Sequence, residues 1–202
     1  MIERPDLLLP ILITGLAPLA IYLLRNNINL REGVSITAGI GTFLSILTFV
    51  PSVLAGKILI YHLFTILPGM EVKFCIDGLG IIFGLVASFL WILATFYNIG
   101  YMRSLSEHAQ TRYYICFTVA IFGAVGVAMS ANVLTLYLFY EIISIFTYPL
   151  VAHHQDAEAY HGGRKYLVYL VGTSKLFLLP AMILTYVLCG TPTFLAHLSF
   201  PL

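Results

Sequence analysis

The sequence predicts an all-α polytopic membrane protein with about six transmembrane helices. Hydrophobic residues make up 60% of the 202 residues, charged residues only 9%, and the mean hydropathy is +0.96. A soluble globular domain is nearer to half apolar and a quarter charged. In addition, six apolar segments are long enough to cross a hydrocarbon core about 30 Å thick as helices. Both observations indicate that lipid is the main solvent of this chain.

The expected helices form one transmembrane bundle over residues 1–202. They lie at 7–24, 34–55, 78–101, 112–130, 132–152 and 166–188. Acids precede the first apolar run, which is unlike a secretory signal peptide, so this run is expected to be a retained helix. Between the second and third helices, "KILIYHLFTILPGMEVKFCIDG" has β-favouring runs on both sides of Pro68-Gly69, which predicts a short β-hairpin-like loop. Only "SAN" joins the fourth and fifth helices, so these should be tight antiparallel neighbours.

The distribution of basic residues predicts that the N-terminus lies outside. With this orientation the inner side holds Arg25, Arg31, Arg103, Arg112, Arg164 and Lys165, and the outer side holds Arg4, Lys57 and Lys73. Basic residues concentrate on the cytoplasmic side of membrane proteins. The bias fits a multi-pass protein of a prokaryotic cytoplasmic (inner) membrane.

Two charged residues fall inside the expected helices instead of at their ends: Glu141 and Lys175. At 1.5 Å of rise per residue, both lie about 15 Å deep, on consecutive antiparallel helices, so they can meet. An ionisable group at that depth costs about 3 kcal/mol unless it is paired or hydrated. One interpretation is an ion pair that only fixes helix packing. An ion path is favoured, because intramembrane acids and bases usually mark such paths.

Helical spacing places Tyr137, Ser144 and Tyr148 on the same face of the fifth helix as Glu141. Three hydroxyl groups around one carboxylate can carry water and protons. Alternatively, Tyr148 anchors the helix at the membrane interface and Ser144 bonds back to its own helix.

The segment "HHQDAEAYHGGRK" is predicted to be an exposed loop at the inner mouth of this polar layer. Its His153, His154 and His161, with Asp156 and Glu158, are metal-ligand types, but their spacing matches no zinc site. A second interpretation is that these histidines exchange protons with bulk water.

No cofactor, metal or nucleic-acid site is predicted. The sequence contains no phosphate-binding, dinucleotide-binding or haem-attachment motif and no basic tract, and its three cysteines are scattered. Any energy for moving ions uphill must therefore come from elsewhere, and no catalytic redox site is expected.

Three segments together resemble the antiporter-like subunits of respiratory complex I, membrane-bound hydrogenases and Mrp-type cation/proton antiporters. "FCIDGLGIIFGLVASFLWILATFYNIGYM" resembles the third helix of that family, opened by Asp77-Gly78 and closed by Tyr97 to Met102. "NVLTLYLFYEIISIFTYPLVAHH" resembles the fifth helix, and Glu141 takes the position of its central glutamate. "YLVYLVGTSKLFLL" resembles the entry to the sixth.

The resemblance implies that residues 1–111 are three leading helices and residues 112–202 the first three helices of an incomplete repeat. Family members have about fourteen helices. In them, the lysine that pairs with the glutamate lies on the helix after the sixth, which is absent from this sequence. Lys175 therefore replaces or supplements that lysine. We expect a part of a longer subunit, a split subunit completed by another polypeptide, or a reduced relative.

The expected function is a proton- or sodium/proton-translocating subunit of a multi-subunit redox pump or cation antiporter. By resemblance, a proton reaching Glu141 neutralises it and weakens its hold on the lysine partner, which then releases its own proton. Expected partners are lipid and other membrane subunits, including one that supplies the later helices. The alternatives are a non-transporting scaffold of such a complex and a small independent ion carrier.

Overall fold

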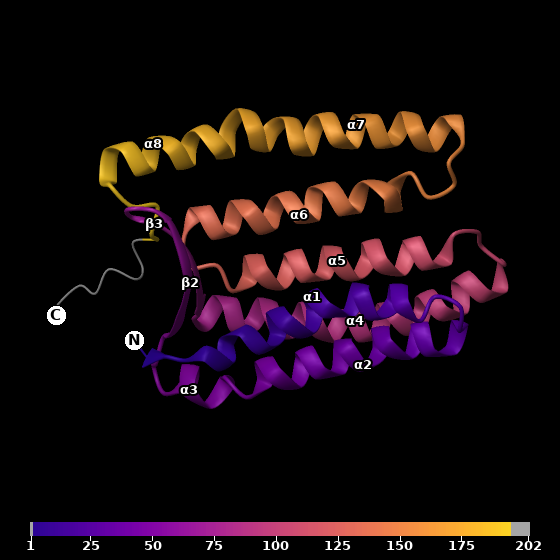
Figure 1. The fold of residues 1–202 in the computed structure, drawn as a ribbon, viewed down its shortest axis with the longest axis horizontal. Helices are drawn as coiled ribbons and strands as arrows, with labels where there is room; N and C mark the ends of the chain where they lie inside the picture. The colour runs from indigo at the N-terminus through magenta and orange to yellow at the C-terminus, as the bar shows by residue number, and fades with distance from the viewer. Residues whose placement is uncertain (1, 195–202) are drawn as a thin grey trace.

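The computed structural model describes residues 2–194, and within them it confirms the predicted class. Six helical segments in this range are long and apolar enough to cross a membrane: Pro5–Leu23, Ile28–Leu54, Gly78–Ser104, Gln110–Ala128, Val133–Val151 and Ala157–Cys189. They run side by side, and a small sheet lies across one end of the bundle (Figure 1).

Three of the six segments are single helices and three are composite. The single ones are α4 (Gly78–Ser104), α5 (Gln110–Ala128) and α6 (Val133–Val151). The first joins a 3-10 turn η1 (Pro5–Leu7) to α1 (Leu8–Leu23), and the second joins α2 (Ile28–Leu47) to α3 (Val50–Leu54). The sixth consists of α7 (Ala157–Thr173), a π-helical turn η2 (Ser174–Leu178) and α8 (Leu179–Cys189).

The predicted hairpin is confirmed and belongs to a three-stranded sheet. Strands β2 (Leu59–Leu67) and β3 (Met70–Ile76) are antiparallel, and β1 (Ile2–Glu3) adds a parallel strand that the sequence did not suggest. Gly69 in the turn has a φ of +81°, and a Cβ there would lie 2.3 Å from the carbonyl oxygen of Gly190. Only glycine meets both conditions without strain.

The sheet fixes the start of α6. The Asn132 side chain caps this helix by accepting a bond from the backbone N–H of Thr135, and it donates to the Glu71 carbonyl at 2.7 Å. The Thr135 hydroxyl accepts a bond from the backbone N–H of Lys73 at 3.0 Å. Two polar side chains of α6 and its cap thus bind β3, and they determine where along the bundle axis α6 begins.

The close packing of α5 on α6, predicted from the short "SAN" connection, depends on two glycines. A Cβ at Gly126 would lie 2.0 Å from the Phe139 ring, and one at Gly123 would lie 2.6 Å from Ile143. Small residues at helical spacing allow two membrane helices to approach closely. The apolar core extends from this contact to the sheet through Phe74, Val125 and Phe139.

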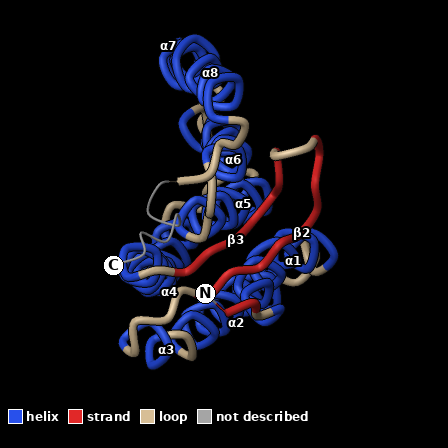
Figure 2. The backbone as a smooth tube through the Cα atoms, turned by 90° about the vertical axis from the view of Figure 1, so that its left-hand side faces the viewer, coloured by secondary structure: helices blue, strands red, loops and turns tan. Residues whose placement is uncertain are grey.

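The α7–α8 segment lies at the edge of the bundle, beside α6 (Figure 2). In its most apolar window only 11% of the residues are buried, against 33–39% for the other five spans. A broad apolar surface of this segment therefore has no described helix against it.

Two predicted helix boundaries were wrong. The second helix begins at Ile28 instead of residue 34, because Asn27 caps it by accepting a bond from the N–H of Leu30. The sixth begins at Ala157 instead of residue 166, because Asp156 caps it at Ala159 N. Most of "HHQDAEAYHGGRK" is therefore helical.

The described chain ends lie at the sheet end of the bundle, as six crossings require (Figure 1). The Tyr186 hydroxyl of α8 donates to the Pro68 carbonyl at 2.8 Å, and Val133 N donates to Pro192 O at 3.0 Å. The assignment of this end to the outside stays a prediction.

We predict that Gly126→Ala weakens the α5–α6 contact. The added methyl group collides with the Phe139 ring, and overpacking of this kind costs about 1–3 kcal/mol. The melting temperature of the purified protein in detergent should fall. The control is Gly100→Ala on α4, where a Cβ meets nothing within 4 Å; equal melting temperatures of the two variants would contradict the packing.

We predict that a membrane-impermeant maleimide labels Cys189 from outside in sealed right-side-out vesicles. Cys189 is exposed at the sheet end, whereas Cys75 and Cys116 are buried. Burial raises the pKa of the Cys75 thiol to about 12, so little reactive thiolate forms there. Cys189→Ser should remove the label. Labelling only in inverted vesicles would show that the predicted orientation is wrong.

Candidate functional site

Glu141 lies in the middle of α6, eight residues after its first residue and ten before its last. The apolar run of this helix forces it to span the membrane, so the carboxylate is carried to the interior of the bundle. Its exposure is 9%. A carboxylate in such a place needs compensating partners.

Lys175 lies in the π turn η2, which interrupts the sixth span between α7 and α8. Pro180 follows this turn at the start of α8. Proline lacks the N–H that an α-helix needs, and its ring crowds the carbonyl four residues earlier. Wide turns of this kind often accompany functional sites in helices. Here the turn presents two consecutive side chains, Ser174 and Lys175, toward α6.

These two side chains bind both oxygens of the Glu141 carboxylate. The Lys175 ammonium forms an ion pair with Oε2, and the Ser174 hydroxyl donates to Oε1. Lys175 Nζ also donates to the Tyr137 hydroxyl at 3.0 Å, one helical turn before Glu141. The contact between an acid and a base at matched depth, predicted from the sequence, is therefore present.

The two charges of the pair differ in surroundings. The Glu141 side chain is 12% exposed, whereas the Lys175 side chain is 47% exposed. The carboxylate is thus enclosed by α6 and η2, and the ammonium faces the side of the bundle where α7–α8 is uncovered. No described helix covers the ammonium on that side.

The other two hydroxyls of the predicted face have different surroundings. Ser144 is buried and donates to the Tyr140 carbonyl of its own helix at 3.0 Å, as in the alternative interpretation. Tyr148 packs against α7, since a Cβ at Gly163 would lie 2.7 Å from its ring. Tyr137 thus binds the charged pair directly, whereas Ser144 bonds within α6 and Tyr148 packs against α7.

The three histidines of the predicted relay are not gathered together. His153 is 8% exposed, whereas His154 and His161 are exposed, and His161 lies on α7 instead of in a loop. Burial, with His108 and Arg112 nearby, lowers the pKa of His153, so its ring is uncharged at neutral pH. His153 follows Glu141 by twelve residues, about 18 Å along the helix axis.

His153 instead gathers with Glu107 and His108, from the connection between α4 and α5. The potential ligand atoms of these three residues all lie within 4.8 Å of one another. Among the described residues, this set has the ligand types and spacing to hold a metal ion. The sequence did not predict it, because His153 is more than forty residues from Glu107 and His108 along the chain.

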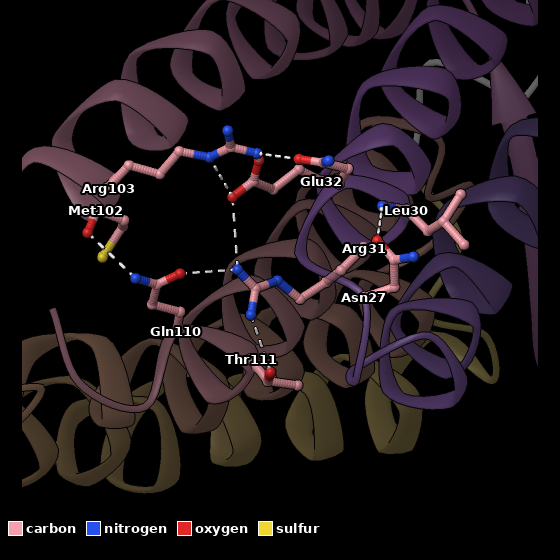
Figure 3. A network of polar contacts seen from close by, with 9 residues as sticks. Asn27, Leu30, Arg31, Glu32, Met102, Arg103, Gln110 and Thr111 are labelled. Carbon is pink, nitrogen blue, oxygen red and sulfur yellow. Dashed lines mark hydrogen bonds and ion pairs between the residues drawn. The ribbon is translucent and has the colours of Figure 1, made fainter. Parts of the chain in front are cut away.

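A second charged cluster, which the sequence did not reveal, joins α2, α4 and α5 at the end remote from the sheet (Figure 3). Arg31 and Glu32 are only 3% and 2% exposed, although both were expected before the second helix. Arg103 donates to Glu32 at 2.5 Å, and Arg31 donates to the Gln110 side-chain oxygen at 2.8 Å. Two features of the sequence could have indicated it: Asn27, a residue type that caps helices, and the adjacent opposite charges of Arg31 and Glu32. The cluster joins the ends of two leading helices, α2 and α4, to the start of α5, and it is remote from Glu141.

Comparison with known proteins supports the resemblance. Residues 130–200, which include Glu141 and Lys175, match the family described as NADH:quinone oxidoreductase/Mrp antiporter, TM. The Na(+)/H(+) antiporter subunit A1 of Staphylococcus aureus is 31% identical over 168 residues, which are 81% of this chain and 20% of that protein. The putative antiporter subunit mnhA2 of Staphylococcus haemolyticus (strain JCSC1435) is 28% identical over 148 residues, 71% of this chain and 18% of that protein.

Two solved structures share the fold. One is the membrane-bound sulfane sulfur reductase, an archaeal respiratory membrane complex, with a TM-score of 0.77 and 23% identity over 96% of this chain and 38% of that one. The other is the Mrp complex from Dietzia sp. DQ12-45-1b, with a TM-score of 0.75 and 18% identity over 93% and 35%.

The chain spans about a fifth of the length of the curated relatives that it matches. The expected resemblance is confirmed on the Glu141 helix and on the fold. The chain therefore belongs to the antiporter-like subunit family shared by respiratory complex I, membrane-bound hydrogenases and Mrp-type cation/proton antiporters.

Proposed function

We propose that this chain translocates protons, or exchanges sodium ions for protons, as a subunit or part of a subunit of a larger membrane complex. The observation that carries the proposal is the Glu141–Lys175 ion pair in mid-span, with an enclosed carboxylate and a half-exposed ammonium. Relatives named as Na(+)/H(+) antiporter subunits support the ion class.

The energetics favour an ion path over a packing device. The free energy needed to remove two charges from water offsets most of the free energy of their attraction. A buried ion pair is therefore a weak way to stabilise helix packing. The close approach of α5 to α6 is at Gly123 and Gly126, which pack against Ile143 and Phe139. The pair is therefore not needed for holding the best-packed helices of the bundle together.

The contacts suggest how one proton moves another. When a proton neutralises Glu141, the Lys175 ammonium loses its counter-ion and keeps only the Tyr137 hydroxyl, a neutral partner. The lysine then releases its proton more readily toward its exposed side. When Glu141 is ionised again, Lys175 regains its counter-ion and takes up a proton again. Ser174 holds the carboxylate in place throughout.

We also propose that further helices cover α7–α8. These belong to the same subunit or to another polypeptide, as expected if residues 1–111 are leading helices and 112–202 begin a repeat. The exposed apolar side chains Leu176, Phe177, Leu184 and Val187 on this segment support that arrangement. The relatives and the positive-inside bias favour the cytoplasmic membrane of a prokaryote.

We predict that Glu141→Gln reduces ion transport by the native complex at least about tenfold, because glutamine keeps the shape but cannot take up a proton. Transport is measured in vesicles as cation-dependent collapse of a pH gradient, normalised to the amount of assembled complex. The matched control is Ser144→Ala on the same helix, whose hydroxyl binds only its own backbone among the contacts described.

The same measurement separates transport from a scaffold role. A scaffold predicts less complex but normal transport per complex. Full transport by an assembled Glu141→Gln complex would overturn the proposed relay, whereas normal assembly with lost transport would support it.

Lys175→Met should likewise reduce transport, because the carboxylate loses its counter-ion and the relay loses its second proton carrier. Lys175→Arg keeps the charge but releases a proton far less readily, so it should restore assembly without restoring transport. The control is Lys165→Met, an exposed lysine on α7. Wild-type transport by both Lys175 variants would show that Lys175 is a packing residue.

A further inference from the structure

We propose that Glu107, His108 and His153 form a site for a divalent transition-metal ion of the Zn²⁺ class. The three residues come from two connections that are far apart in the sequence. Glu107 and His108 lie between α4 and α5, and His153 lies between α6 and α7. Their potential ligand atoms lie within 4.8 Å of one another. The proposal does not rest on the proposed transport function.

The burial of His153 is the first observation that points to a ligand. The residue is 8% exposed, and neither of its ring nitrogens has a hydrogen-bond partner among the described residues. Buried polar groups are nearly always hydrogen-bonded, and an unpaired one calls for a missing partner. A metal ion satisfies a neutral imidazole nitrogen in such a place.

The arrangement of the carboxylate is the second observation. Glu107 Oε2 lies 3.8 Å from His153 Nε2 and 3.7 Å from His108 Nδ1, so it is close to both imidazoles. In a tetrahedral zinc site with bonds of about 2.0–2.1 Å, ligand atoms are about 3.3 Å apart. The two distances from Glu107 are thus about half an ångström longer than in such a site, and no pair of ligand atoms is more than 4.8 Å apart, so small side-chain movements bring the three atoms to bonding distance.

The ligand types select the class of metal. Two imidazoles and one carboxylate suit zinc and other first-row transition ions, whereas magnesium and calcium prefer oxygen ligands. The Glu107 side chain is 13% exposed and His108 is 48% exposed, so the site is closed on the His153 side and open to solvent at His108. A water molecule can take the fourth position from that side.

The neighbouring groups hold His153 in place. Arg112 of α5 donates to the His153 carbonyl at 3.0 Å, and the His108 and His153 rings are stacked with centroids 5.0 Å apart. The Tyr113 ring meets the His153 ring edge-on. The Arg112 charge opposes the bound cation, and Glu107 offsets it. An ion bound here joins the α4–α5 connection to the α6–α7 connection, at the end of the bundle remote from the sheet.

The test is zinc binding by the full chain, purified in detergent without a polyhistidine tag and stripped with a chelator. Zinc is titrated against a chromophoric chelator, and Co²⁺ absorption reports the coordination geometry. We expect one ion per chain. His153→Gln and Glu107→Gln should each weaken binding at least about tenfold. His154→Gln, the adjacent exposed histidine, and His161→Gln on α7 are the matched controls and should leave the affinity unchanged.

His108→Gln distinguishes a lost metal ligand from a misfolded protein, because this exposed residue can be substituted without disturbing the core. A loss of binding in His108→Gln with an unchanged melting temperature of the metal-free protein supports the site. Zinc should also raise the melting temperature of the wild type and not that of His108→Gln. Equal weakening by His154→Gln or His161→Gln, or no binding of Zn²⁺ to the wild type at micromolar concentrations, would overturn the proposal.

Discussion

The absence of water from the bilayer core is the constraint on which this structure depends. Each polar group carried into the core must find its partner within the protein, because lipid offers none. Glu141 satisfies that demand with Lys175 and Ser174, which come from the one irregular turn of the sixth span. The same contact joins α6 to the α7–α8 segment, in which only 11% of the most apolar window is buried.

The sheet determines where Glu141 lies along the bundle. Asn132 and Thr135 bind β3, and the apolar core around Phe74 and Phe139 joins the sheet to the α5–α6 contact. A shift of α6 by one residue would break these bonds and would move the carboxylate by 1.5 Å relative to the π turn. Through α6, the contacts with the sheet thus determine the position of the ion pair in the middle of the span.

Local signals predicted most of the fold, and tertiary contacts explain what they missed. Apolar length alone identified six spans, and Pro68-Gly69 identified the hairpin, because both are properties of short segments. The strand at Ile2–Glu3 carries no pattern, since its pairing with β2 depends on a partner about sixty residues away. Depth counting predicted the contact of Glu141 with Lys175. It could not predict that His153 meets Glu107, because the relative position of two loops follows from the packing of four helices.

The exposure of Lys175 argues that the pair belongs to a larger bundle. The residue lies fourteen positions before Cys189, about 21 Å along the helix axis from that end of the span. A lysine near a helix end can extend its ammonium to the interface, but one at this depth cannot. Its side chain is nevertheless 47% exposed, and the flanking side chains Leu176 and Phe177 face outward as well. A charge in that place is stable only beside water or polar groups, so the proposed covering helices must be polar where they face Lys175 and apolar on either side.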